Sequence, residues 1–125
     1  MANEITLSAS LSVRKGYLDS GTRPRSRSFT LNAASPAKAS GVKSFTHTTH
    51  TAMPLGDVAT LGWARFENVD PTNYVEIGIV VSATFYPTAR LKAGEFYPLR
   101  LVPGVTYYAK ANTAAVLLDY EIYDD

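Results

Sequence analysis

The sequence predicts an all-β protein: an antiparallel β-sandwich of about eight strands, jelly-roll-like, in a single domain over residues 1–125. Three observations indicate this fold class. Short segments in which apolar and polar residues alternate recur at intervals of roughly 8–12 residues. Pro or Gly residues separate these segments, as in the turns of antiparallel sheets. No window of about eleven residues has the apolar period of a helix.

The N-terminal third contains one regular strand pattern and one segment without a pattern. In "ITLSASLSV", residues 5–13, apolar side chains alternate with Thr and Ser, which predicts a half-buried strand. The following "RKGYLDSGTRPRSRS", residues 14–28, contains four arginines, two glycines and a proline but few apolar residues. We expect this segment to be an irregular basic loop or arm. "FTLN", residues 29–32, is typical of a short strand.

Strand patterns are more regular in the rest of the chain. Residues 43–53 are rich in Thr and predict an edge strand or a segment that covers a neighbouring subunit. Further strands are expected at residues 63–69, 74–81, 85–91, 96–102, 105–111 and 116–123. Pro71, Gly94 and Gly104 fall in the turns between them. Pro87 places its own strand at an edge or a bulge, because proline cannot donate a hydrogen bond to a central ladder.

Composition narrows the class of protein. Charged residues make up 18% of the chain, below the roughly 25% of an ordinary globular domain. There is no cysteine, so neither a disulfide framework nor a thiolate metal site is expected. No apolar run approaches the roughly 18 residues of a membrane span, and the N-terminus lacks the pattern of a signal peptide. We therefore expect a soluble protein with no membrane partner.

No residues form a recognisable catalytic or metal-binding pattern. His47 and His50 are the two histidines, and at a spacing of three they would point to opposite faces of a strand. Carboxylates such as Glu67 and Asp70 fall in turns or on polar strand faces, where solvated carboxylates are usual. We expect no enzyme activity, no metal and no cofactor.

Basic residues are concentrated near the N-terminus. Residues 1–43 hold seven basic and two acidic residues (7 − 2 = +5), whereas residues 44–125 hold five and nine (5 − 9 = −4). Arg23, Arg25 and Arg27 carry guanidinium groups, which bind carboxylates or phosphates in bidentate fashion. With few aromatic residues beside them, these arginines favour an acidic protein partner over nucleic acid. A solvated loop is an equally good interpretation.

Three tyrosines are predicted to point outward from their strands: Tyr74, Tyr108 and Tyr123. Exposed tyrosine is typical of protein interfaces. Sugar-binding modules also use tyrosine for stacking, so a protein interface and a glycan site both remain open.

Several segments of the C-terminal half resemble a known group of proteins. These are "NVDPTNYVEIG" (residues 68–78), "LKAGE" (91–95), "YAKA" (108–111) and the last strand with its acidic end (116–125). They resemble small proteins that tailed bacteriophages encode among their virion genes. The resemblance covers about half of the chain and includes no catalytic motif.

The resemblance implies a virion structural protein, assembled in the host cytoplasm and located in the bacteriophage particle. The leading expectation is a capsid decoration (cement) protein that binds neighbouring subunits of the major capsid protein or other virion proteins. It implies a homo-oligomer, with a trimer favoured. A tail, connector or fibre component is the alternative in the same setting, and a receptor- or glycan-binding module is the alternative from another class.

Overall fold

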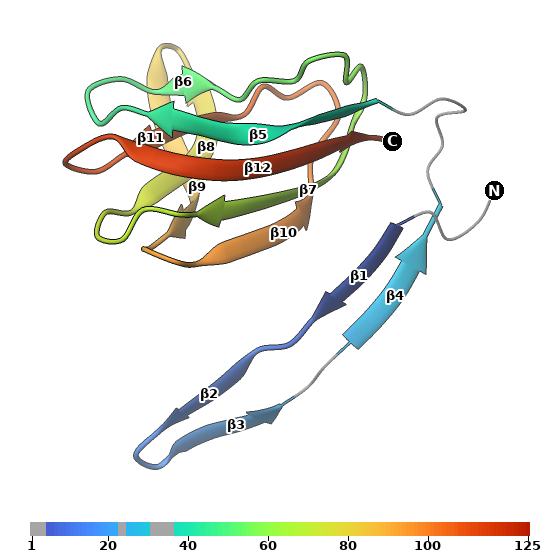
Figure 1. Ribbon diagram of the computed structural model, residues 1–125, viewed down its shortest axis with the longest axis vertical. Coiled ribbons are helices and arrows are strands. Elements are labelled where there is room, and N and C mark those ends of the chain that lie inside the picture. Colours follow the sequence, from blue (N-terminus) through green and yellow to red (C-terminus); the bar gives the residue numbers. More distant parts are fainter. Residues whose placement is uncertain (1–4, 23–24, 31–36) are drawn as a thin grey trace. The chain divides into compact units, whose positions relative to one another are not determined.

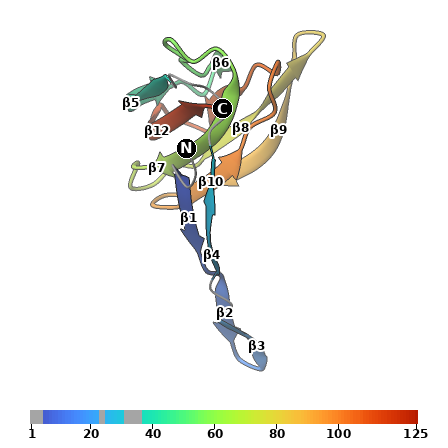
Figure 2. The same cartoon turned by 90° about the vertical axis from the view of Figure 1, so that its right-hand side faces the viewer.

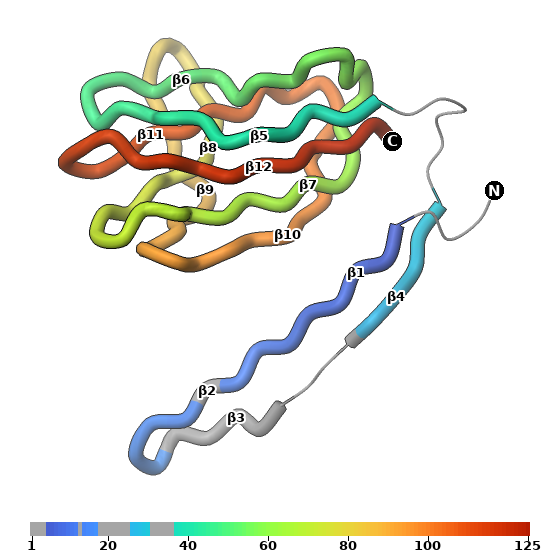
Figure 3. The backbone as a smooth tube through the Cα atoms, viewed as in Figure 1, coloured from blue at the N-terminus to red at the C-terminus, as the bar shows by residue number. Residues whose placement is uncertain are grey.

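The structure, a computed structural model, describes the backbone of residues 5–22, 25–30 and 37–125 (Figure 1). Within these ranges the side chains of residues 13, 18–22 and 25 lie outside the description, and Figure 3 draws these residues in grey. The chain divides into two compact units, residues 1–34 and residues 35–125. We call the first unit the ribbon and the second the body. The sequence suggested one domain, whereas the structure separates the ribbon from the sandwich because the described strands β1 to β4 pair only with one another.

The body confirms the all-β antiparallel fold class. Its described residues form eight strands and no helix: β5 (Lys38–Phe45), β6 (Thr51–Ala52), β7 (Leu61–Asn68), β8 (Val75–Val81), β9 (Thr84–Leu91), β10 (Phe96–Arg100), β11 (Tyr108–Ala111) and β12 (Val116–Asp124). They make two four-stranded sheets, in the orders β10-β7-β12-β5 and β6-β11-β8-β9 (Figure 1). In Figure 2, β5, β12 and β7 lie on one side of the body and β8 and β9 on the other.

Strand pairing in the body is nested. The first strand pairs with the last (β5 with β12), and the second with the seventh (β6 with β11). The third pairs with the sixth (β7 with β10), and the fourth with the fifth (β8 with β9). The eight strands of the body therefore form two antiparallel sheets of four, as in a β-sandwich.

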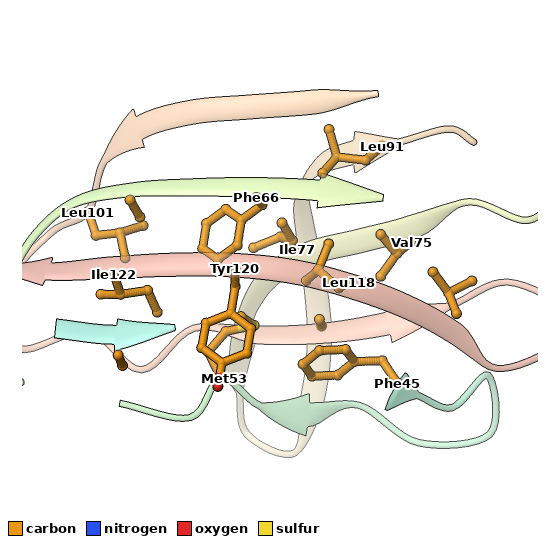
Figure 4. Close-up of a cluster of buried hydrophobic side chains, with 14 of the residues drawn as sticks. Phe45, Met53, Phe66, Val75, Ile77, Leu91, Leu101, Leu118, Tyr120 and Ile122 are labelled. Carbon is orange, nitrogen blue, oxygen red and sulfur yellow. The ribbon is translucent and has the colours of Figure 1, made fainter. Parts of the chain in front are cut away.

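The core lies between the two sheets and follows from the alternation of the strands. In β12, every second residue from Val116 to Asp124 is buried, and the residues between them are half-buried or exposed. Phe66 and Leu118 from one sheet meet Val75 and Ile77 from the other (Figure 4). Each large apolar side chain buried in this way stabilises the fold by about 1.5–3 kcal/mol.

In the part of residues 14–28 that the structure describes, 14–22 and 25–28, strands replace the irregular arm that composition suggested. β1 (Ile5–Ala9) pairs with β4 (Arg25–Phe29), and β2 (Ser12–Lys15) pairs with β3 (Leu18–Thr22). Gly16, with φ of +58°, and Tyr17 make the two-residue turn between β2 and β3. Glycine at the first turn position suits a hairpin whose strands follow the natural twist. Low apolar content argues against an independent core, but a tight turn lets polar strands pair through their backbones.

Pro87 lies in an edge strand, where the missing N–H donor of proline is tolerated. It belongs to β9, which is an edge strand of its sheet, and the register of β8 and β9 shifts between Ile77 and Gly78, next to Pro87. The prediction that this strand lies at an edge or a bulge is confirmed. The edge position of residues 43–53 is also confirmed in part, because β5 and β6 are both edge strands.

Candidate interaction surfaces

The predicted arginine cluster belongs to the ribbon. Arg23 lies outside the described residues. Arg25 pairs with Ala9 through the backbone, and its side chain is outside the described part of the chain. Arg27 is exposed, and its Nη1 donates a hydrogen bond to the backbone oxygen of Ser26 (2.9 Å). The register therefore places Arg25 and Arg27 two residues apart on one strand of the ribbon, opposite Ala9 and Leu7.

The ribbon has two different faces near its open end. One face carries hydroxyl groups: Thr6 Oγ1 lies 3.2 Å from Ser28 Oγ, and Ser8 Oγ donates to Ser26 Oγ (3.0 Å). The opposite face carries Ile5 across from Phe29 and Leu7 across from Arg27. The ribbon is thus amphipathic, and within its own unit the described residues form no second layer over either face.

The outer surface of the sheet β10-β7-β12-β5 carries a cluster of charges around one arginine. Arg65 Nη1 lies 3.0 Å from Glu67 Oε2, its Nη2 lies 3.5 Å from Asp119 Oδ1, and its Nε donates to Glu121 Oε2 (3.5 Å). Burial lowers the pKa of Arg65, but the three carboxylates outweigh that effect and raise the pKa above its ordinary value. One guanidinium against three carboxylates leaves this cluster at 1 − 3 = −2. We call this outer surface the acidic face.

Exposed apolar side chains lie beside the acidic cluster. Strand register aligns Phe96, Glu67, Asp119 and Val42 in one row across β10, β7, β12 and β5. Phe96 is 65% exposed and Val42 58%. Leu117 and Val69, which are 50% and 45% exposed, lie one step further along the same face, where the Val69 nitrogen donates to the Leu117 oxygen (3.2 Å).

The sequence analysis did not identify these four exposed apolar residues as a group. The alternation in each strand shows that Phe96, Val42 and Leu117 point outward, which is a signal that can be read along one strand at a time. Only the register between strands shows that they lie together. Four exposed apolar residues around a charged centre resemble the mixture of apolar and polar groups at protein interfaces.

The predicted tyrosines are half-buried and do not share one surface. The ring of Tyr74 lies under the guanidinium of Arg90 (4.1 Å), which also bonds Glu76. Tyr108 is on the outer surface of the other sheet, since its neighbour Ala109 is buried. Tyr123 is on the acidic face, where desolvation and the neighbouring Glu121 raise its pKa.

The two histidines have separate environments. His47 lies in the bend between β5 and β6 and not on a strand, so the expected divergence of the two rings across a strand does not apply. His50 stacks on Phe85 at 5.9 Å between ring centroids and meets the edge of Tyr108 at 5.3 Å. Within the described residues, no group of three or more His, Cys, Asp or Glu side chains is placed to hold a metal ion.

The "NVDPTNYVEIG" segment is structural. Asn68 is fully buried; its Nδ2 donates to the backbone oxygens of Asn73 (2.8 Å) and Leu91 (2.9 Å), and its Oδ1 accepts from the Asp70 nitrogen (2.9 Å). Asp70 Oδ1 in turn accepts from the nitrogens of Thr72 and Asn73, and these bonds lower the pKa of Asp70. The segment therefore connects the end of β7 to the start of β8 and the end of β9.

No protein-family model matches this chain, and no curated protein matches it either. The residues that the structure describes contain no helix of the length and hydropathy that a membrane span requires.

Proposed function

We propose that this protein is a structural component of a bacteriophage virion: a capsid decoration protein that binds neighbouring subunits of the major capsid protein. One observation carries the proposal. The chain has, in addition to a sandwich with its own core, a separate ribbon that is amphipathic and carries exposed basic residues.

An isolated two-stranded hairpin is marginally stable in water, because it buries too little apolar surface. A ribbon of this kind gains stability when a partner supplies the second layer. Its exposed residues support that role: Leu11 is 77% exposed and Tyr17, at the turn, is fully exposed. Such a segment serves to bind a neighbour, and repeated contacts of modest strength add up in a symmetric shell.

The resemblance of the C-terminal segments to tailed-phage virion proteins supports the setting. Asn68 and Gly78, two residues of those segments, contribute to the packing of the sandwich: Asn68 donates to backbone oxygens, and Gly78 allows two strands to approach closely. The nested pairing of the eight strands supports the jelly-roll expectation, and viral capsid domains use that fold, although the same fold hosts many other functions.

The same features allow a role as a tail, connector or fibre component. The number of copies of the protein in each phage particle distinguishes these roles from decoration. Quantitative gels of purified particles should show hundreds of copies for a decoration protein and a few to dozens for a tail or fibre component. Absence from the particles would reject the virion proposal. A second experiment uses particles from a phage that lacks the gene. Added protein should bind the heads of these particles and raise the temperature at which they release DNA.

A glycan-binding module is the less supported alternative. Tyr74 and Tyr108 lie on the outer surface of one sheet and Tyr123 on that of the other, so these three do not make one stacking platform.

A further inference from the structure

We infer that the ribbon of one copy packs on the acidic face of a second copy. The ribbon would cover the exposed apolar side chains of Phe96, Val42 and Leu117, and its arginines would approach the carboxylates around Arg65. This contact between copies does not depend on the virion setting, so it goes beyond the proposed function.

Each of the two surfaces lacks what the other supplies. The ribbon face with Ile5 and Leu7 forms a single layer within its unit and needs an apolar surface to cover it. The acidic face offers such a surface, with side chains that are 45–65% exposed. Packing one on the other buries apolar area on both sides, which is the main source of binding free energy.

Charge complementarity identifies the ribbon as the occupant of the acidic face. Residues 1–34 hold five basic residues and two acidic ones (5 − 2 = +3). The cluster on the acidic face is at −2, because Glu67, Asp119 and Glu121 share Arg65. Elsewhere on that face Arg100 pairs with Asp125, and Lys38 adds one positive charge, so the face as a whole is at 3 − 4 = −1. Arg27 lies beside Leu7 on the ribbon, just as Glu67 and Asp119 lie beside Phe96 and Val42 on the face. Apolar and charged groups therefore alternate in both surfaces and can match each other.

A second copy satisfies both surfaces at once. Every copy carries one ribbon and one acidic face, so head-to-tail contacts leave neither surface open when the rotation between copies closes a ring.

Because the chain has no cysteine, crosslinking with introduced cysteines can test the contact. Ala9→Cys puts a thiol on the ribbon face beside Arg25, and Ser40→Cys or Ser44→Cys puts one on the acidic face without removing a charge. Ala52→Cys is the control: it is also a small exposed residue, but it lies on the outer surface of the other sheet, opposite Tyr108.

The variants carry two different tags and are mixed, equilibrated and treated with a short bis-maleimide. We expect products that contain both tags from Ala9→Cys with Ser40→Cys or Ser44→Cys, and at least about tenfold less product with Ala52→Cys. Equal yields with the control would overturn the inference. A chain that carries both thiols and crosslinks only to itself would also overturn it, since the ribbon would then cover its own body.

Charge reversal provides a second readout. Arg25→Glu with Arg27→Glu should weaken self-association, measured by sedimentation at low salt, by about tenfold or more in dissociation constant. Glu67→Arg with Asp119→Arg in the second copy should restore it. A protein that stays monomeric at every concentration, or a reversal that no opposite charge rescues, would reject the contact. The copy number in particles tests the proposed function separately, so either idea can fail alone.

Discussion

A Cβ atom on Gly78 would lie 2.1 Å from the backbone oxygen of Tyr86, on the neighbouring strand. That distance is far inside van der Waals contact, and the atom in the way belongs to the backbone. Gly78 sits where the register of β8 and β9 shifts, so the two strands approach closely at the bulge. The last residue of "NVDPTNYVEIG" is therefore a packing requirement.

Gly78→Ala should destabilise the body by about 3 kcal/mol or more, because β8 and β9 must separate to admit the methyl group. Urea unfolding of the purified variant measures this change. Gly104→Ala is the control: its Cβ would meet nothing within 4 Å, and only the strain of φ at +79° remains, which costs about 1–2 kcal/mol. Equal losses for the two variants would contradict the close approach at Gly78.

Asn68→Ala should cost about 3 kcal/mol. Its removal leaves the oxygens of Asn73 and Leu91 without the Asn68 amide donor, and the Asp70 nitrogen without its acceptor. Asn112→Ala is a suitable comparison, since the Asn112 side-chain oxygen is buried without a hydrogen-bond partner. We expect the Asn112 variant to lose much less stability in chemical denaturation, and a larger loss there would contradict the role given to Asn68.

Asp124 should make the free energy of unfolding of the body depend on pH in the acidic range. Its Oδ1 accepts from the nitrogens of Thr60 (2.8 Å) and Ala59 (2.9 Å), and its Oδ2 accepts from Ala37 (3.3 Å). These hydrogen bonds, that of Thr60 first, lower the pKa of Asp124. A carboxylate with a lowered pKa in the folded state contributes stability above its unfolded pKa of about 3.9, and that stability is lost as the pH falls through the folded pKa.

Asp124→Asn should therefore lower the melting temperature at neutral pH, and the gap to the wild type should shrink as the pH falls below about 4. Calorimetry across the pH range measures both curves. Asp57→Asn changes an exposed carboxylate and should run parallel to the wild type. A constant gap for Asp124→Asn at every pH would show that its charge does not matter.

Arg65→Gln should destabilise the body by about 1 kcal/mol at low salt and by less at high salt. Without the guanidinium, Glu67, Asp119 and Glu121 repel one another, and salt screens charges at this exposed surface. Unfolding at two ionic strengths measures the difference. If the loss is the same in both, packing of the Arg65 stem and not its charge supports the sheet.

The strands of the body could be predicted from the sequence because one buried face imposes period two. Val75 and Ile77 in β8, and Val116, Leu118 and Ile122 in β12, follow that pattern, and all are buried. A strand was expected at residues 5–13, where β1 and part of β2 lie, but their pairing with β3 and β4 was missed. The pairing of Arg25 to Phe29 with Ile5 to Ala9 depends on backbone hydrogen bonds and a two-residue turn, which leave little trace in composition.

The sequence by itself determined the class of the fold and the places of its turns, since alternation, proline and glycine act over a few neighbouring residues. It also determined that Arg23, Arg25 and Arg27 form a basic segment. Only the tertiary structure decided which strands are neighbours, because pairing joins residues far apart in the chain, such as Lys38 and Tyr123. The acidic face arises from that choice: Phe96, Glu67, Asp119 and Val42 come from four separate segments, and the register of the sheet aligns them in one row.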